Sequence, residues 1–232
     1  MRLAIMQPYF MPYIGYFQLI ANTDLFIVYD NIKYTKRGWI NRNRILRDGK
    51  DVILSLPLKT ASDSLFVADR RLATDFDPHK LLSQIKNAYR RAPFFRDIFC
   101  LLEDILLFND HNLFQFTVNS ITKICNHLSI TTRIRVSSTF AIDHSLRAQD
   151  KILALCDETH AQVYVNPIGG LDLYSKLAFA ERGVELRFMR SIPFEYQQFK
   201  APFVPWLSII DVMMFNSSET IGAILQSGWK YE

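Results

Sequence analysis

The sequence predicts an α/β domain with a mainly parallel β-sheet, because short apolar segments alternate with longer segments of helical periodicity. Glycine, proline and polar residues separate these segments. The chain has 232 residues, of which 49% are hydrophobic, so it can bury one large core. We therefore expect residues 1–232 to form a single α/β domain.

Six segments have the β-branched and aromatic content that is typical of strands. They are Leu3–Gln7, Leu25–Asp30, Val52–Leu56, Arg133–Ser137, Gln162–Asn166 and Glu185–Met189. The helices between them are expected to begin at side chains that can accept a hydrogen bond from the first turn. These predicted N-caps are Asp77 (followed by Pro78), Asn112, Ser145, Asp172 and Ser217.

Residues 77–128 contain consecutive helical patterns and no strand pattern. We interpret this segment as a helical insertion or cap within the α/β domain. The remaining alternation of strands and helices is that of a Rossmann-like sheet.

Several classes of protein do not fit the sequence. The N-terminus lacks the pattern of a signal peptide, and no apolar run approaches the ~20 residues of a membrane-spanning helix. The three cysteines, Cys100, Cys125 and Cys156, form no CxxC pair. A disulfide framework or a zinc site is therefore not expected, and we predict a cytoplasmic protein with structural cysteines.

The net charge of +4 comes from one segment of the chain. Between Lys33 and Lys50, seven basic residues stand against the single acid Asp48. Such a segment is either a solvated loop or a binding site for a phosphate-bearing partner. The polar residues interleaved with it favour the second interpretation.

Polar residues follow four of the predicted strands. They are Gln7, then Asp30 and Asn31, then Ser137–Thr139, and finally Asn166 with Gly169 and Gly170. Ligands of open parallel sheets bind beyond the carboxyl ends of the strands. The sequence therefore predicts a shared polar cleft at this edge.

The turn after the first strand is unusually aromatic and stiff. Pro8 and Pro12 restrict its backbone, and Gly15 allows a close approach of another group. Tyr9 and Tyr13 offer flat faces that suit a sugar or a base. The alternative is that the aromatic residues only pack the first helix against the sheet.

A second concentration of candidate residues is the stretch GWINRNRI, residues 38–45. The guanidinium group of Arg42 suits a phosphate or a carboxylate, and Asn41 and Asn43 supply hydrogen-bond donors. Trp39 can stack on a base or a sugar. We interpret the stretch as a ligand-binding loop rather than an exposed turn.

The sequence lacks the common catalytic fingerprints. There is no Gly-x-Gly-x-x-Gly motif after a strand, no P-loop and no Gly-x-Ser-x-Gly motif, so no cofactor can be named. The five histidines are scattered, and only His144 follows a strand end closely. Asp30 is the best candidate for a general base. Asp211 lies in the apolar run LSIIDVMMF, where a catalytic role and a structural role are both open.

Four motifs are IMQPYFMPYIGYFQLI, NIKYTKRGWINRNRI, YVNPIGGLDLY and FVPWLSIIDVMMFN, in that order. In these motifs the chain resembles the WbqC-like protein family along essentially its whole length. The resemblance implies a cytoplasmic protein of bacterial surface-polysaccharide (O-antigen, lipopolysaccharide) biosynthesis. It carries site roles onto Gln7, Pro8, Tyr13, Gly15, Asp30, Asn31, Asn41, Arg42, Asn43, Asn166, Gly169, Gly170, Tyr174, Gln197, Ser208 and Asp211.

A second similarity concerns Tyr13-Ile14-Gly15-Tyr16. These residues stand where the nucleotidylyltransferase superfamily carries its His-x-Gly-His turn. The glycine and the spacing match, whereas the two imidazoles are replaced by tyrosines, which stabilise phosphate charge only weakly. The similarity implies a related fold rather than the same mechanism.

Three functions follow from these observations. The first is a transferase acting on a nucleotide-activated amino sugar, with acyl or aminoacyl transfer, Asp30 as base and a charged tRNA as an alternative donor. The second is a nucleotidylyltransferase using a triphosphate, and the third is a sugar-nucleotide binding or scaffold protein without catalysis. A homo-oligomer is compatible with each of the three.

Overall fold

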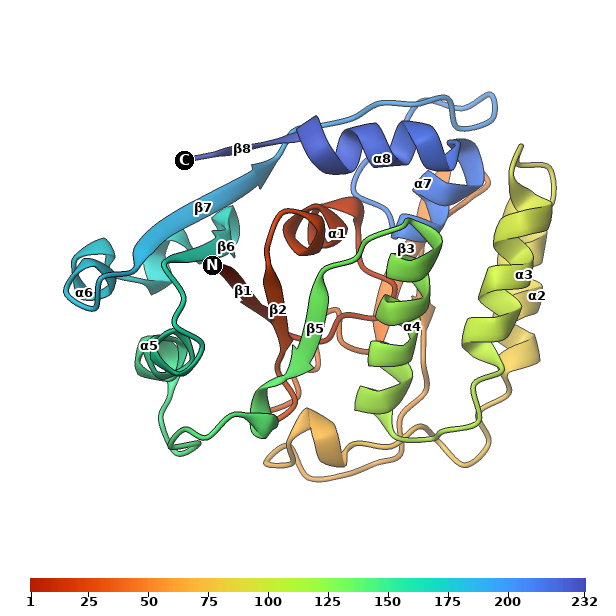
Figure 1. Cartoon of the computed structure of the whole chain (residues 1–232). Coiled ribbons are helices and arrows are strands. Elements are labelled where there is room, and N and C mark those ends of the chain that lie inside the picture. Colours follow the sequence, from red (N-terminus) through yellow and green to blue (C-terminus); the bar gives the residue numbers. More distant parts are fainter.

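The computed structural model describes residues 1–232 and contains one six-stranded sheet with helices on both faces (Figure 1). The strand order is β5-β2-β1-β6-β7-β8. The strands are β1 (Arg2–Met6), β2 (Leu25–Val28), β5 (Arg133–Val136), β6 (Val163–Pro167), β7 (Glu185–Ser191) and β8 (Trp229–Tyr231). All neighbours pair in parallel except β7 and β8. The predicted mainly parallel, Rossmann-like α/β fold is confirmed.

Alternating residues of the central strands face opposite sides of the sheet. Leu3 and Ile5 of β1 join an apolar cluster with α5 (Ala148–Glu158) and α6 (Lys176–Ala180). Ala4, between them, belongs to the larger cluster on the other face. That face is covered by α1 (Ile14–Ala21), α4 (Leu113–His127) and α8 (Ser218–Ser227) (Figure 1). A strand that is covered on both faces consists mostly of apolar residues. This apolar run is the pattern from which the strand was predicted.

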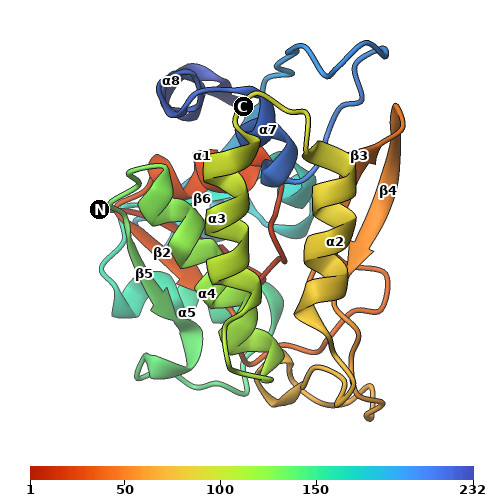
Figure 2. The ribbon, with the colours of Figure 1, turned by 90° about the vertical axis from the view of Figure 1, so that its right-hand side faces the viewer.

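The remaining elements extend the larger cluster away from the sheet. Helices α2 (Pro78–Tyr89), α3 (Phe95–Leu106) and α7 (Ile209–Phe215) contribute to it, as does the hairpin of β3 (Arg42–Arg47) and β4 (Lys50–Ser55). Figure 2 shows the hairpin beside α2. The three short 3-10 helices are η1 (Val67–Asp69), η2 (Ser137–Thr139) and η3 (Ile168–Leu173). The predicted strandless stretch 77–128 indeed contains helices α2 to α4.

Some elements differ from the predictions. The stretch GWINRNRI was predicted to be a loop, but its second half, from Arg42, forms β3, which pairs with β4 outside the main sheet. The signal for this hairpin is Asp48-Gly49, whose φ angles of 52° and 74° allow a tight two-residue turn. Strand β8 and helix α7 were not predicted at all.

The N-cap predictions are confirmed at three helices and wrong at two. The side chains of Asp77, Asn112 and Ser217 accept hydrogen bonds from the first turns of α2, α4 and α8. Helix α6 is capped by Ser175 rather than Asp172, because residues 168–173 form η3 first. Helix α5 starts at Ala148, three residues beyond Ser145, and has no side-chain cap.

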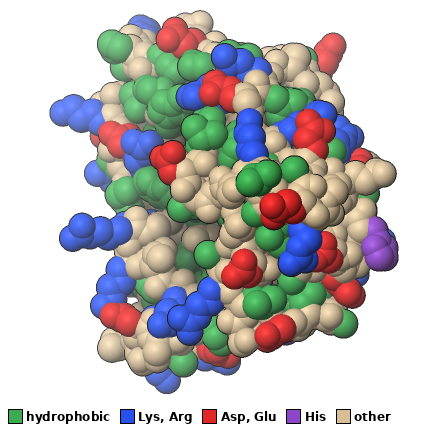
Figure 3. Space-filling view, turned by 90° about the vertical axis from the view of Figure 1, so that its left-hand side faces the viewer, with side chains coloured by type: hydrophobic (Ala, Val, Ile, Leu, Met, Phe, Trp, Pro, Cys, Tyr) green, Lys and Arg blue, Asp and Glu red, His purple; other side chains and the backbone are tan.

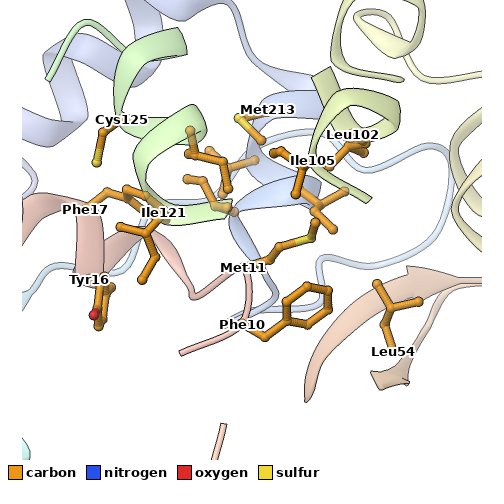
Figure 4. Packing of buried hydrophobic residues seen from close by; sticks show 14 of the residues in the cluster. Phe10, Met11, Tyr16, Phe17, Leu54, Leu102, Ile105, Ile121, Cys125 and Met213 are labelled. Carbon is orange, nitrogen blue, oxygen red and sulfur yellow. The ribbon is translucent and has the colours of Figure 1, made fainter. Parts of the chain in front are cut away.

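The aromatic turn after β1 divides its side chains between the core and the surface. Figure 4 shows Phe10 and Met11 packed in the core with Leu54 of β4 and Ile105 of α3 nearby. Both residues are completely buried, whereas Tyr9 is only half-buried. Tyr9 and Tyr13 are partly exposed and flank the consecutive buried residues 10–12, so the turn is anchored in the core while these two tyrosines lie nearer the surface.

Candidate functional site

A cavity of about 950 Å³ lies beyond the carboxyl ends of β1, β2 and β6. It is lined by Gln7 after β1, Asn31 after β2 and Asn166 at the end of β6. Strand β2, which follows β1 in the chain, lies on one side of β1 in the sheet. Strand β6, which the chain reaches after β5, lies on the other side of β1. The strand order therefore reverses at this place, which is where open α/β sheets bind their ligands.

The charged groups that line the cavity are all basic. They are Lys33, Arg147 and Lys151, and the lining contains no aspartate or glutamate. Seen from the side of α5 and α6, Lys and Arg side chains predominate along the left-hand edge of the molecule (Figure 3). A cavity with cationic walls and no carboxylate favours an anionic ligand.

Asn31 is the centre of a hydrogen-bond network in the cavity wall. Its Oδ1 accepts from the Nζ of Lys151 at 2.8 Å and from the hydroxyl of Ser137 at 3.0 Å. Its Nδ2 lies 3.0 Å from Nδ1 of His144, whose Nε2 lies 3.1 Å from the carbonyl oxygen of Phe140. Through Asn31, the network connects the ammonium of Lys151 and the imidazole of His144, after the carboxyl end of β2 and near the N-terminal end of α5.

Lys151 is the most constrained of the basic residues. Only 5% of its surface is exposed, and its Nζ lies 5.6 Å from the ring centroid of Tyr29. Burial lowers the pKa of Lys151, and the nearby Asp30 carboxylate opposes this shift. With one hydrogen bond to Asn31, the ammonium retains donors for a ligand in the cavity.

The first turn of α5 borders the same cavity. His144, Arg147 and Ala148 belong to the lining, and no side chain caps the helix. Ala148 has a φ of 46°, a strained conformation for a residue with a Cβ. Free backbone N–H groups and the helix dipole make such an end favourable for an anion.

Tyrosines form much of the remaining wall. Tyr9, Tyr13, Tyr16, Tyr29 and Tyr174 all line the cavity. Burial raises the pKa of each of them, so their hydroxyls are neutral. The hydroxyl of Tyr16 donates to the carbonyl of Gln7 at 2.9 Å. Neutral hydroxyls can hydrogen-bond to a ligand but cannot replace two imidazolium ions of a nucleotidylyltransferase.

Two glycines permit close contacts in this wall. A Cβ at Gly15 would lie 2.4 Å from Cε2 of Tyr13 and 2.3 Å from Oγ of Ser191. A Cβ at Gly170 would lie 1.8 Å from Nδ2 of Asn166. The two glycines therefore leave the space that a neighbouring side chain of the lining occupies, namely Tyr13 beside Gly15 and Asn166 beside Gly170. Gly169, by contrast, has no atom within 4 Å of the corresponding position.

Most predicted substrate-binding residues lie together in the cavity. Its lining includes Gln7, Tyr9, Tyr13, Gly15, Asn31, Trp39, Asn166, Gly169, Gly170 and Tyr174. They come from the ends of three strands and from two loops that are far apart in the sequence. The prediction of a shared cleft at the strand ends thus describes a real cavity of this fold, while the binding role of each residue stays a prediction.

Asp30, the predicted base, lies behind the lining. It is 7% exposed, and its Oδ1 accepts from the hydroxyl of Ser137 at 2.7 Å and from the backbone N–H of Ser138 at 3.1 Å. Its position next to Asn31 brings its charge near Lys151. Asp30 therefore influences the cavity electrostatically.

Asp211, the second predicted catalytic residue, is completely buried outside the cavity. Its carboxylate accepts from the hydroxyl groups of Tyr89 and Tyr196 at 2.8 and 2.6 Å and from Nε2 of Gln198 at 2.6 Å. Burial raises its pKa, while the three donors oppose the shift. These contacts join α2, α7 and the segment before α7.

Five other predicted residues lie outside the large cavity and serve the backbone or the solvent. The Nδ2 of Asn41 donates to the carbonyl of Leu56, and the Nε of Arg42 donates to that of Gly38. Asn43 donates to the carbonyls of Phe10 and Met11, and Ser208 caps α7. Gln197 is exposed, whereas its neighbour Gln198 contacts Asp211.

The sequence reasoning did not single out Arg147 and Lys151. Lys151 stands one position before the apolar run Ile152–Leu155 of α5 and looks like an ordinary solvated helix residue. No signal in the sequence marked this site, because Ser145 offered an N-cap for α5 that the structure does not use. No group of three or more His, Cys, Asp or Glu side chains is placed to hold a metal ion. None of the helices combines the length and apolar character that crossing a bilayer requires.

The WbqC-like protein family matches residues 7–223, which is nearly the whole chain. The chain belongs to this family. The resemblance in the four motifs is therefore confirmed, and the matched range contains every predicted site residue as well as Arg147 and Lys151. Among relatives, an uncharacterized protein of Mycobacterium tuberculosis, Rv1507c, is 28% identical over 218 residues, which cover 93% of each chain. No solved structure matches the chain.

Proposed function

We propose that this WbqC-like protein is a transferase that binds a nucleotide-activated amino sugar in the large cavity. The observation that carries the proposal is the combination of Lys33, Arg147 and Lys151 with a lining that lacks carboxylates. A nucleoside diphosphate sugar has the two negative charges that such a cavity favours, together with rings that suit Tyr9, Tyr13 and Trp39. The family's association with surface-polysaccharide clusters agrees with this ligand class.

The diphosphate would lie at the start of α5. There the free N–H groups of the first turn and the ammonium of Lys151 converge on the cavity. A charge-assisted hydrogen bond from a buried ammonium is stronger than one from a solvated surface lysine. Arg147, in the same turn, adds a guanidinium at the rim.

The reaction we propose is acyl or aminoacyl transfer to the amine of the sugar. The amine nitrogen attacks the acyl carbonyl carbon and loses a proton to a base. The bond between the acyl carbon and the donor breaks, and the leaving group of the donor keeps the electron pair of that bond. Both nitrogens of the His144 imidazole have partners, Nδ1 with the amide of Asn31 and Nε2 with the carbonyl of Phe140, so His144 accepts that proton at Nδ1 only after the contact with Asn31 is released. Asp30 lies behind Asn31, and its carboxylate opposes the lowering of the Lys151 pKa by burial.

A charged tRNA is one acyl donor that the surface suits. In the basic segment, Arg37, Arg47 and Lys50 are exposed and form no ion pair with an acidic side chain. Exposed cations of this kind contact phosphates of a nucleic acid backbone. The small thioester donors are the alternative within the same reaction class.

A melting experiment tests the ligand. UDP-N-acetylglucosamine should raise the melting temperature of the wild-type protein, because it binds only the folded state. The Lys151→Met variant should lose this rise. Lys86→Met is the matched control, since Lys86 is exposed on α2 far from the lining. An equal rise in Lys151→Met, or a rise with N-acetylglucosamine alone, would contradict the proposed phosphate site.

Turnover is tested separately by mass spectrometry. A nucleotide amino sugar is incubated with the protein and with acetyl-coenzyme A or aminoacyl-tRNA, and the mass of the sugar nucleotide is followed. A mass increase that requires the protein supports the transferase. Binding without any change in mass would favour the second candidate, a non-catalytic sugar-nucleotide carrier, which the absence of carboxylates from the lining also suits.

A further inference from the structure

A second, smaller cavity adjoins the large one. It measures about 240 Å³ and is lined by Tyr9, Pro12, Tyr13, Trp39, Asn43, Arg44 and Trp206. Tyr9, Tyr13 and Trp39 line both cavities, so the two spaces meet at these three rings. These three rings therefore border both the cavity that contains Lys151 and the second cavity.

Aromatic rings make up most of the wall of the small cavity. Trp206 lies edge-on to Tyr13, with 6.1 Å between ring centroids and an angle of 69° between planes. Trp206 is 48% exposed and Trp39 is 37% exposed, although indole side chains usually find a partner. Trp206 also has a φ of 59°, a backbone conformation that a tryptophan adopts at an energetic cost.

Arg44 supplies an unpaired donor in the same wall. Its two terminal nitrogens are held by Asp51 at 3.2 Å and by the carbonyl oxygen of Trp206 at 3.1 Å. Its Nε is buried and has no hydrogen-bond partner. Because this Nε is closed to solvent, a ligand does not reach it, and Arg44 acts on the small cavity through its positive charge. The side chain of Asn43, in contrast, is fully occupied by backbone groups.

These features define the chemistry of the ligand. A volume of about 240 Å³ is about a quarter of that of the large cavity, which suits one six-membered ring with substituents rather than a whole nucleotide. Aromatic walls pack well against the C–H face of a sugar ring, and the positive charge of Arg44 favours a ligand that carries oxygen substituents. The guanidinium group, 5.6 Å from the Trp39 centroid, disfavours a cationic occupant.

We propose that the small cavity is the sugar subsite, which binds the pyranose ring of the nucleotide sugar while the diphosphate remains at α5. This inference rests on the proposed function and adds the place of the sugar to it. The ring at this place contacts the wall that Tyr9, Tyr13 and Trp206 share, in which Tyr13 and Trp206 pack edge to face. The base of the nucleotide then stays in the large cavity.

The test compares two ligands in three proteins by titration calorimetry. UDP and UDP-N-acetylglucosamine share the nucleoside and the diphosphate and differ in the sugar and in one charge of the terminal phosphate, so the change in the ratio of their dissociation constants between wild type and a variant measures what the substituted residue contributes to binding the sugar. Trp206→Gly removes the indole, and glycine adopts the positive φ without strain. We expect this variant to bind UDP like wild type and UDP-N-acetylglucosamine about tenfold more weakly.

The Lys151→Met variant separates this proposal from the proposed function. It should weaken both ligands, because both carry the diphosphate. Trp229→Phe, in β8 outside both cavities, is the control for loss of an indole and should bind both ligands like wild type. If Lys151→Met leaves both affinities unchanged, the proposed phosphate site is wrong.

Two results would overturn the sugar subsite while the proposed function stands. In the first, Trp206→Gly weakens UDP as much as UDP-N-acetylglucosamine, which assigns the small cavity to the base. In the second, Trp206→Gly changes neither affinity although Lys151→Met changes both, which leaves the small cavity without a role in binding.

Discussion

The side-chain amide of Asn166 lies directly against the α-carbon of Gly170, in the wall of the large cavity. A Cβ at position 170 would come within 1.8 Å of Nδ2 of Asn166. The Oδ1 of the same amide accepts from the buried hydroxyl of Tyr164 at 3.2 Å. The glycine thus allows a buried tyrosine and a cavity-lining amide to share one short segment after β6.

The first prediction concerns this contact. Gly170→Ala should displace Asn166 and lower the free energy of unfolding by about 1–3 kcal/mol, the usual cost of overpacking. It should also weaken binding of UDP-N-acetylglucosamine. Gly169→Ala is the matched control, because its Cβ meets no atom within 4 Å and should change stability by at most about 0.5 kcal/mol. Equal stability of the two variants in urea denaturation would contradict the packing argument.

The second prediction concerns Gly15 in α1. Its Cβ would collide with the ring of Tyr13 and with Ser191, so Gly15→Ala should push the tyrosine into the cavity. We expect a loss of stability of about 1–3 kcal/mol and weaker ligand binding. Gly222→Ala in α8 should do the opposite, because its Cβ meets open space and alanine favours the helix by about 1 kcal/mol. Thermal and urea denaturation of both variants would measure the contrast.

The position of the cavity was predictable, and one physical rule explains why. Parallel strands end at the same edge, so Gln7, Asn31 and Asn166 had to come together once the strands were recognised. Lys151 was not predictable by this rule, since it comes from the helix that crosses between two strands. The burial of Lys151 depends on how α5 packs against the sheet. This packing is part of the tertiary structure and cannot be read from the local sequence.

Polar residues in buried segments were harder to interpret. Asn43 and Arg42 suggested a ligand loop, yet the two residues lie in β3, and their side chains donate to backbone carbonyls of nearby turns. An unpaired backbone carbonyl needs a hydrogen-bond donor, and so does a ligand. The residue type alone does not show whether an Asn or Arg side chain donates to the backbone or to a ligand. The Asp48-Gly49 turn was the better sequence signal, because it indicates a hairpin.

The third prediction separates structural from catalytic roles at Asp211. Asp211→Ala would leave the hydroxyls of Tyr89 and Tyr196 and the amide of Gln198 without their acceptor. Leaving buried donors unpaired costs about 1–3 kcal/mol each, so we expect a loss of at least about 3 kcal/mol in urea denaturation. The folded variant should still bind UDP with wild-type affinity. A stable variant that binds ligand but has lost turnover would restore the catalytic assignment.

The fourth prediction concerns pH and Lys151, whose pKa burial lowers below its ordinary value of 10.5. Bound phosphate favours the charged ammonium, so the affinity for UDP should fall as pH rises through the lowered pKa. Titrations should begin above about pH 7, where the phosphate itself is already ionised. In Lys151→Met this fall should be absent. A fall of the same size in both proteins would show that another group is responsible.

The stability of the ligand-free protein should change in the opposite direction. Between the lowered pKa of Lys151 and 10.5, the unfolded chain binds more protons at this residue than the folded protein does. The contribution of Lys151 to the free energy of unfolding therefore rises with pH in this window, because the folded state no longer has to bury a charge. The difference in unfolding free energy between wild type and Lys151→Met, followed by urea denaturation against pH, isolates this contribution. Weaker binding together with higher stability over the same pH range would identify one buried ammonium as the origin of both changes.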